Sequence, residues 1–248
     1  MDKYGLIGYP LGHSFSLDFF NEKFENEGIN AQYENFEISS IENLPEIIDT
    51  HQDLCGLNVT SPYKEQVMSY LDAISPEARS IGAVNVVKVI HKGNKTILRG
   101  FNTDAIGFRK SIEPILERFH KKALILGTGG AAKAVAYGLK ALGIDTQYVS
   151  RTDRKGCMRY EQITPETIEE YNVIVNCTPC GMYPHTEECP KLPYEAMDNH
   201  TLLYDLIYNP DETLFLKKGK EQGTIIKNGL EMLLLQAFAS WELWNEKE

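Results

Sequence analysis

The stretch "KKALILGTGGAAKAVAYGLKALGIDTQYVSR", residues 121–151, decides the fold class. An apolar run leads into a glycine-rich turn, and an alanine-rich segment follows that ends near Gly143. A second apolar run then ends at Ser150. This order predicts a strand, a tight turn, a helix and a second strand, which together make a βαβ unit.

The glycine turn of this unit predicts a dinucleotide site. Gly127, Gly129 and Ala132 follow the pattern G-x-G-x-x-A, and they lie between a predicted strand and a predicted helix, as the pattern requires. Glycines at these places let backbone N–H groups approach a pyrophosphate at the positive end of the helix. The alternative is a tight turn that binds nothing.

The end of the second strand favours NADP over NAD. Enzymes that use NAD usually place an acid here for the ribose 2′-hydroxyl, whereas this chain has Arg151 and Thr152, followed by Arg154. Guanidinium and hydroxyl groups suit a 2′-phosphate. Asp153 lies two residues beyond Arg151, and a solvated basic turn is the alternative.

Segments on either side of this unit extend the α/β pattern. Short apolar runs alternate with amphipathic ones over the first hundred residues, and residues 83–100 read as a hairpin that turns around 92–95. Residues 103–120 predict a helix that connects two domains. Residues 229–244, "GLEMLLLQAFASWELW", predict a helix that is apolar nearly all round and is therefore buried.

A lysine near the start of another predicted helix is a candidate proton carrier. In "LNVTSPYKEQV", residues 57–67, Ser61 suits an N-cap and Pro62 the first helical position, which puts Lys64 in the first turn. The positive end of a helix disfavours an ammonium there, and a general base needs a readily lost proton. The alternative is a lysine on a solvated surface.

The composition limits the class of protein. The 248 residues suffice for one large domain or two small ones, and the net charge of -10 opposes binding to nucleic acid or to anionic membranes. We expect a cytoplasmic protein without a signal peptide or a membrane span.

Five cysteines, an odd number, favour reduced thiols. Cys177, Cys180, His185 and Cys189 have a spacing close to that of a small zinc site, but their acidic surroundings favour no metal.

Several motifs, in the same order along nearly the whole chain, resemble those of the shikimate dehydrogenase family. They are "GYPLGHSFS" at 8–16, "NVTSPYK" at 58–64, "GAVN" at 82–85, "FNTD" at 101–104, "GTGGAAKA" at 127–134, "SRT" at 150–152, "NCTPCGM" at 176–182, "DLIYNP" at 205–210 and "GLEMLLLQA" at 229–237. Each motif alone is weak, and the combination is specific.

The resemblance implies an α/β protein of two domains with a deep cleft between them. Residues 1–104 with 230–248 would form a substrate-binding domain, and residues 105–229 a Rossmann-type, doubly wound domain that binds NADP. The implied reaction is the NADP-linked interconversion of 3-dehydroshikimate and shikimate, on the route to aromatic amino acids. The implied partners are this small-molecule substrate and the cofactor, and the expected assembly is a monomer or a homodimer.

The same resemblance implies roles for individual residues. Lys64 and Asp104 would form the catalytic pair, with Lys64 acting either as a base or as an electrostatic clamp on the reacting oxygen. The implied substrate-binding residues are Ser14, Ser16, Thr60, Asn85, Tyr208 and Gln236. The implied cofactor-binding residues are Gly127, Gly129, Gly130, Ala131, Arg151, Thr152, Arg154, Gly229 and Met232.

Two further functions fit parts of the pattern. A quinate/shikimate dehydrogenase of broader substrate and NAD(P) use has a related sequence, although Ser16 and the turn at Arg151 favour the shikimate-specific, NADP-linked enzyme. A non-catalytic nucleotide-binding sensor on the same fold would keep the glycine turn but has no need of Lys64 with Asp104.

Overall fold

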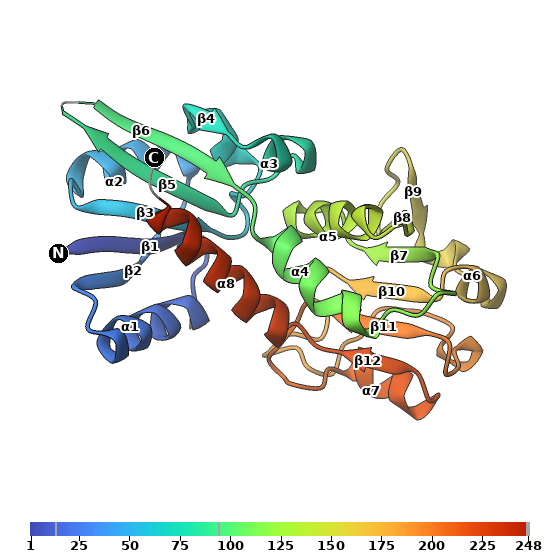
Figure 1. The fold of residues 1–248 in the computed structure, drawn as a ribbon. Coiled ribbons are helices and arrows are strands. Elements are labelled where there is room, and N and C mark those ends of the chain that lie inside the picture. The colour runs from blue at the N-terminus through green and yellow to red at the C-terminus, as the bar shows by residue number, and fades with distance from the viewer. Residues whose placement is uncertain (13, 94, 247–248) are drawn as a thin grey trace. The chain divides into compact units, whose positions relative to one another are not determined.

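The computed structural model describes residues 1–12, 14–93 and 95–246, and the chain divides into two compact units (Figure 1). The first unit contains Met1–Thr103 and Ala237–Glu248, and the second contains Asp104–Gln236. The sequence-based boundaries lie after residues 104 and 229 instead. That the first unit takes the substrate and the second takes NADP stays a prediction.

The first unit is built, within its described residues, on a six-stranded sheet with the order β2-β1-β3-β5-β6-β4. The strands are β1 (Asp2–Gly8), β2 (Ala31–Glu37), β3 (Leu54–Val59), β4 (Ala73–Ile74), β5 (Val86–Lys92) and β6 (Lys95–Phe101). β1 runs parallel to β2 and β3, whereas β5 runs antiparallel to β3 and β6. The predicted antiparallel hairpin is therefore confirmed, and the sheet is mixed.

Apolar side chains cover both faces of this sheet. The α-helices around it are α1 (Phe15–Glu27), α2 (Leu44–Thr50), α3 (Pro76–Ile81) and the C-terminal half of α8 (Leu230–Asn245). Tyr4 of β1 packs with Phe20 of α1 and Trp244 of α8, whereas Ile7 packs in a second cluster with Leu44 of α2. Residues an odd number apart on a strand point to opposite faces, so the alternation in β1 supplies both cores.

The segment after β3 corrects the predicted helix at Ser61. Residues 61–65 form turns, the Ser61–Pro62 peptide is cis, and a short 3-10 helix begins only at Gln66 and ends at Tyr70. The backbone carbonyl of Lys64 accepts a hydrogen bond from the N–H of Val84 at 2.7 Å. Because this long-range bond takes the carbonyl that a helix would use, Lys64 is not in a helical first turn.

The second unit, Asp104–Gln236, is described without a gap and contains a parallel sheet with the order β12-β11-β10-β7-β8-β9. The strands are β7 (Lys122–Leu126), β8 (Asp145–Ser150), β9 (Cys157–Arg159), β10 (Val173–Asn176), β11 (Leu202–Asp205) and β12 (Ile225–Lys227). The chain starts in the middle of the sheet and builds outward to each side, as in a doubly wound fold. The βαβ unit at 121–151 is confirmed as β7, α5 (Gly130–Ala141) and β8.

Helices cover both faces of the parallel sheet (Figure 1). They are α4 (Asp104–Ile112), α5, α6 (Pro165–Glu170) and α7 (Leu214–Glu221). Ile125 of β7 packs in one apolar cluster with Phe108 of α4, whereas its neighbour Leu124 packs in another with Phe215 of α7. α4 is shorter than the helix predicted over 103–120, because a 3-10 turn follows it at Glu113–Ile115.

The last helix, α8, is buried on one face only. Ala237, Ser240 and Trp244 lie on that face, whereas the side chains of Leu230 and Phe238 are 40% and 47% exposed. The expectation of a wholly buried helix is therefore wrong for these two positions. Among the described residues, no helix has both the length and the apolar content that crossing a lipid bilayer requires.

Candidate functional site

Five of the predicted site residues lie along one edge of the first sheet. β1 and β3 are parallel and end together, since Ile7 pairs with Val59. β5 begins and β6 ends at the same edge, because Asn58 pairs with Val86 and Val86 pairs with Phe101. The predicted residues in the segments next to these strand ends are Ser14, Ser16, Thr60, Lys64 and Asn85.

Ser14 and Ser16 lie at the start of α1. Ser14 is the N-cap, and its hydroxyl accepts a hydrogen bond from the N–H of Leu17 at 3.4 Å. Ser16 lies in the first turn of the helix and is half-buried. Ser14 also borders a cavity of about 350 Å³, whose lining residues are Gly12, Ser14, Leu17, Asp18 and Asn35. Hydroxyls at the positive end of a helix suit a carboxylate ligand.

Thr60 and Lys64 follow the end of β3 and are half-buried. The N–H of Thr60 donates to the carbonyl of Ile7 at 2.9 Å. A Cβ added at Gly8 would lie 2.4 Å from Cγ2 of Thr60, so glycine at this position leaves room for the threonine. The tertiary bond at the Lys64 carbonyl fixes the lysine backbone beside the same edge.

Asn85 is held by Thr103 through a reciprocal pair of hydrogen bonds. Nδ2 of Asn85 donates to Oγ1 of Thr103 at 2.9 Å, and the N–H of Thr103 donates to Oδ1 of Asn85 at 2.7 Å. Both residues are buried. Since an amide nitrogen donates and an amide oxygen accepts, the two bonds assign the orientation of the Asn85 side chain.

Three buried residues that sequence reasoning missed extend this arrangement. Asn58 accepts a hydrogen bond from the Tyr33 phenol at 2.8 Å, and its Nδ2 donates to Oγ of Ser240 at 3.1 Å. A polar residue inside an apolar segment was the available signal, because Asn58 lies in "LCGLNVT" and Ser240 in "AFASWELW".

The remaining predicted substrate-side residues belong to the second unit. Asp104 begins α4 and is buried, Tyr208 follows β11 and is exposed, and Gln236 lies buried on α8. Nε2 of Gln236 donates to the carbonyl of Leu233 at 2.9 Å. Pairing of Lys64 with Asp104 would join residues of different units, and it stays a prediction.

The glycine turn in the second unit has the geometry that a pyrophosphate requires. Gly127 has φ +111°, and a Cβ there would lie 3.2 Å from the carbonyl oxygen of Cys177. Gly129 is the N-cap of α5, no side chain of the described residues caps this helix, and a Cβ at Gly129 would meet nothing within 4 Å. Gly130 and Ala131 begin the helix. The start of this 12-residue helix therefore has no side-chain cap within the part of the chain that the structure describes, and it has open space at the Cβ position of Gly129, which fits an anionic group.

Cationic side chains lie beside this turn. Arg151, Thr152 and Arg154 are exposed after β8, and Nη1 of Arg154 donates to Oγ1 of Thr128 at 2.9 Å. The nearby Asp153 is exposed and lies 3.0 Å from Arg159, which also pairs with Glu161. The donor set of Arg151, Thr152 and Arg154 fits a ribose 2′-phosphate.

Gly229 and Met232, expected near a nicotinamide, lie in tightly packed surroundings. A Cβ at Gly229 would lie 2.1 Å from the carbonyl oxygen of Leu206, so only glycine fits. Met232 is buried in the apolar cluster that contains Phe108 and Tyr204. Packing alone explains both residues, and a contact with nicotinamide stays a prediction.

The cysteines of the C-x2-C-x4-H-x3-C motif are not gathered around one point. Within the described residues, no group of His, Cys, Asp and Glu side chains is placed to hold a metal ion, and all five cysteines are free.

A buried carboxylate, that of Asp205, lies beside this motif. Asn176, which precedes Cys177, donates from Nδ2 to the carboxylate of Asp205 at 3.0 Å, and Thr213 donates to the same carboxylate at 2.6 Å. Burial raises the pKa of Asp205 to about 6. The motifs around Asn176 and Asp205 are thus joined by a buried carboxylate.

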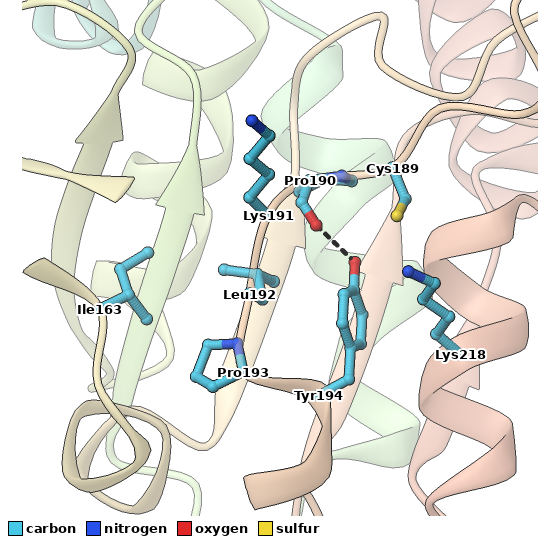
Figure 2. A pocket seen from close by; sticks show the side chains of 8 residues that line it. All are labelled: Ile163, Cys189, Pro190, Lys191, Leu192, Pro193, Tyr194 and Lys218. Atoms are coloured by element: carbon cyan, nitrogen blue, oxygen red, sulfur yellow. Dashed lines mark hydrogen bonds between the residues drawn. The ribbon is translucent and has the colours of Figure 1, made fainter. Parts of the chain in front are cut away.

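A cavity of about 440 Å³ lies elsewhere in the second unit (Figure 2). Lys218 of α7 lies over the ring of Tyr194, and the Tyr194 phenol donates to the carbonyl of Pro190 at 2.8 Å. None of the predicted site residues lines this cavity. Volume alone therefore does not identify the functional site.

Comparison with known proteins gives one consistent family. Residues 6–87 match the family described as the shikimate dehydrogenase substrate binding domain. The shikimate dehydrogenase (NADP(+)) of Carboxydothermus hydrogenoformans is 39% identical over 257 aligned residues, which cover 97% of this chain and 90% of that protein.

Solved structures agree with this comparison. Shikimate 5-dehydrogenase from Thermus thermophilus, in complex with NADP(H) and shikimate, is 32% identical with a TM-score of 0.85, and the match covers 99% of this chain and 94% of that one. Quinate dehydrogenase from Corynebacterium glutamicum, in complex with NAD, is 26% identical with a TM-score of 0.86, covering 98% and 93%. The two neighbours share a fold and differ in named substrate and cofactor.

Proposed function

Because the chain belongs to the shikimate dehydrogenase family, we propose that it catalyses the reversible, NADP-dependent reduction of 3-dehydroshikimate to shikimate. This is an oxidoreductase reaction on the route to chorismate and the aromatic amino acids. One observation supports this proposal most directly. The N-terminus of α5 has no side-chain cap among the described residues and precedes the exposed Arg151 and Arg154, in a chain whose relatives are named NADP(+) enzymes.

The second unit binds the cofactor in this proposal. NADPH supplies the hydride for reduction, and NADP⁺ accepts it in the reverse direction. The backbone N–H groups at Gly129, Gly130 and Ala131 hold the pyrophosphate at the positive end of α5. Arg151, Thr152 and Arg154 hold the 2′-phosphate, and the Arg154–Thr128 bond keeps one guanidinium beside the turn.

Polar side chains, most of them in the first unit, orient the substrate in this proposal. Ser14 and Ser16 donate to the substrate carboxylate at the start of α1, with Tyr208 helping at that end. Thr60, Asn85 and Gln236 bind the ring hydroxyls. Such donors and acceptors, fixed before binding, reject molecules whose hydroxyls are missing or misplaced, because buried groups would be left without partners.

Lys64 and Asp104 handle the proton. In oxidation Lys64 accepts the proton of the reacting hydroxyl, and in reduction it returns that proton to the carbonyl oxygen. Asp104 holds the ammonium and the hydroxyl in line. If Lys64 stays charged throughout, its contribution is electrostatic stabilisation of the oxygen as negative charge develops.

A quinate/shikimate dehydrogenase of broader specificity is the second candidate. The similarity to the quinate dehydrogenase that binds NAD supports it. Arg151, Thr152 and Arg154 support the NADP-linked enzyme instead. Substrate and cofactor must therefore be varied independently.

The test follows nicotinamide reduction by absorbance with purified protein in four pairings: shikimate or quinate, each with NADP⁺ or NAD⁺. Turnover that is strong only with shikimate and NADP⁺ is the expected result. Comparable rates with quinate or NAD⁺ would support the broader enzyme. Folded protein that binds NADP⁺ but turns over neither substrate would support a nucleotide-binding sensor.

The proposal also includes the compartment in which the enzyme acts and its oligomeric state. We place the enzyme in the cytoplasm, where free thiols such as the five described here stay reduced. A monomer or a homodimer is the proposed assembly, and light scattering of the purified protein at several concentrations distinguishes the two.

A further inference from the structure

A chain of buried polar side chains runs through the first unit, and one of the proposed substrate residues, Asn85, lies on it. Its members are Tyr33, Asn58, Ser240, Thr103 and Asn85. All five side chains are less than a tenth exposed. The members come from β2, β3, α8 and the segments next to β5 and β6.

The directions of the bonds are fixed at one end by Tyr33. Burial raises the pKa of this phenol well above its usual range, so it keeps its proton and donates to Oδ1 of Asn58. The Asn58 amide must then present Nδ2 to the other side, where it donates to Oγ of Ser240 at 3.1 Å and approaches the carbonyl of Asn85 at 3.5 Å.

The hydrogen bonds lead from Ser240 through Thr103 to Asn85, the side chain that is proposed to bind a ring hydroxyl. Oγ of Ser240 lies 3.2 Å from Oγ1 of Thr103, which accepts a hydrogen bond from Nδ2 of Asn85. Thr103 also precedes Asp104 directly in the sequence. The orientation of Asn85 and the position of the backbone at Thr103 therefore depend on Ser240.

The polar character of this chain calls for an explanation beyond folding. Tyr33 stacks on Phe20 with ring centroids 4.8 Å apart, inside an apolar cluster that also contains Trp244. Apolar side chains of similar size would fill such a position without the cost of burying hydroxyl and amide groups. A fully bonded polar network does, however, specify a single arrangement of its members.

We propose that Tyr33, Asn58 and Ser240 are positioning residues, which hold Asn85 in the orientation that binds a ring hydroxyl of the substrate. The polar atoms of the Asn58 side chain are directed to protein partners, so it acts through its neighbours rather than by touching the substrate. This inference rests on the proposed function and extends it to residues outside the binding surface.

The test compares Ser240→Ala with a matched control, Ser111→Ala. Ser111 lies on α4 in the second unit, is as buried as Ser240, and also loses a hydrogen bond to a buried hydroxyl, that of Tyr204 at 2.6 Å. We expect Ser240→Ala to lower kcat/KM for shikimate by roughly tenfold, with KM for NADP⁺ unchanged. Ser111→Ala should lower stability while leaving kcat/KM for shikimate within about twofold of the wild type.

A second pair of variants, at Thr103, tests the same hydrogen bonds with little change in the shape of the side chain. Thr103→Val keeps the shape of the side chain but removes the hydroxyl that Ser240 and Asn85 contact, and Thr103→Ser keeps the hydroxyl. Thr103→Val should match Ser240→Ala, and Thr103→Ser should restore most of the activity. Tyr33→Phe, which keeps the stacked ring, should lower kcat/KM by a few fold through the same route.

The outcomes separate this inference from the function on which it rests. Wild-type protein that does not oxidise shikimate with NADP⁺ would overturn the proposed function. Active wild-type protein with Ser240→Ala and Thr103→Val both indistinguishable from Ser111→Ala would overturn the positioning role. Equal losses in KM for shikimate and for NADP⁺ would also overturn it, because general loosening of the fold would then explain the effect.

Discussion

The two sheet edges at which we propose ligand binding are built in different ways. At the edge in the first unit, the side chain of Asn85 is held by hydrogen bonds to Thr103, and both residues are buried. At the glycine turn in the second unit, the backbone at Gly129 faces open space and the nearby Arg151 is exposed. A ring with several hydroxyls needs fixed partners in fixed places, whereas a pyrophosphate needs N–H groups, positive charge and room.

The comparison predicts its largest effect for Lys64, the one basic side chain among the proposed substrate-side residues. Lys64→Ala should lower kcat by roughly 10²–10⁴-fold, because the proton carrier or charge clamp is lost. KM for shikimate should change little, since the lysine acts mainly in the transition state. Initial rates at saturating NADP⁺ measure both constants.

The control for this variant is another half-buried lysine of the first unit. Nζ of Lys88 donates to the carbonyl of Leu243 at 3.0 Å, and neither residue is one of the proposed site residues. Lys88→Ala should keep its kcat. Equal losses in the two variants would mean that Lys64 matters only for folding.

Asp205 is a titratable group buried in the second unit, whereas the buried polar side chains described in the first unit carry no charge. Burial raises its pKa from 3.8 to about 6, so folding favours the protonated carboxyl. The resulting stabilisation is fully present below pH 3.8 and is lost as the pH rises through about 6.

Asp205→Asn removes this dependence on pH. The free energy of unfolding of the variant, relative to the wild type, should therefore rise by up to roughly 3 kcal/mol between about pH 4 and pH 7. Urea unfolding at the two pH values measures it. A difference between variant and wild type that stays constant with pH would show that Asp205 titrates normally.

A substitution at Gly129 tests whether the N-terminus of α5 binds the pyrophosphate of NADP⁺. Ala at this position meets no protein atom within 4 Å and its φ of -81° is ordinary, so stability should be nearly unchanged. The new methyl group would stand where a pyrophosphate approaches, and KM for NADP⁺ should rise roughly 10–100-fold.

Gly127→Ala provides the contrast to this variant. Its φ of +111° is unfavourable for alanine, so this variant should lose stability as well as NADP⁺ binding. Thermal unfolding together with NADP⁺ titration separates the two effects. Unchanged NADP⁺ affinity in Gly129→Ala would mean that the cofactor binds elsewhere.

Arg154 gives the smallest expected change and tests the choice of cofactor. Arg154→Ala should raise KM for NADP⁺ by roughly tenfold, through loss of a charge-assisted bond to the 2′-phosphate, without weakening the use of NAD⁺. Arg118, an exposed arginine of the same unit, supplies the control. A parallel loss for both nucleotides would place Arg154 away from the 2′-phosphate.

Local patterns predicted the βαβ unit of the second unit correctly, whereas the roles of its glycines and arginines in cofactor binding stay predictions. The glycine turn, the βαβ unit and the arginines after Ser150 lie within one short stretch, where strand, turn and helix signals follow one another directly. The family resemblance added the substrate side residue by residue, although its roles there stay predictions.

Long-range contacts explain what the sequence did not reveal. The helix expected at Ser61 is absent from residues 61–65, because the carbonyl of Lys64 bonds to Val84 instead. The bond between Asn58 and Ser240 joins residues 182 positions apart, and no periodicity links them. Buried polar positions were visible in both apolar segments, but their partners were not.

In the proposed function, the substrate binds mainly at the sheet edge of the first unit that contains Ser14, and NADP binds at the glycine turn of the second unit. KM for shikimate and KM for NADP⁺, measured in the wild type, in Ser14→Ala and in Gly129→Ala, test this division. Ser14→Ala should raise only KM for shikimate, and Gly129→Ala only KM for NADP⁺. A rise in KM for NADP⁺ alone in Ser14→Ala, or in KM for shikimate alone in Gly129→Ala, would show that the division is wrong.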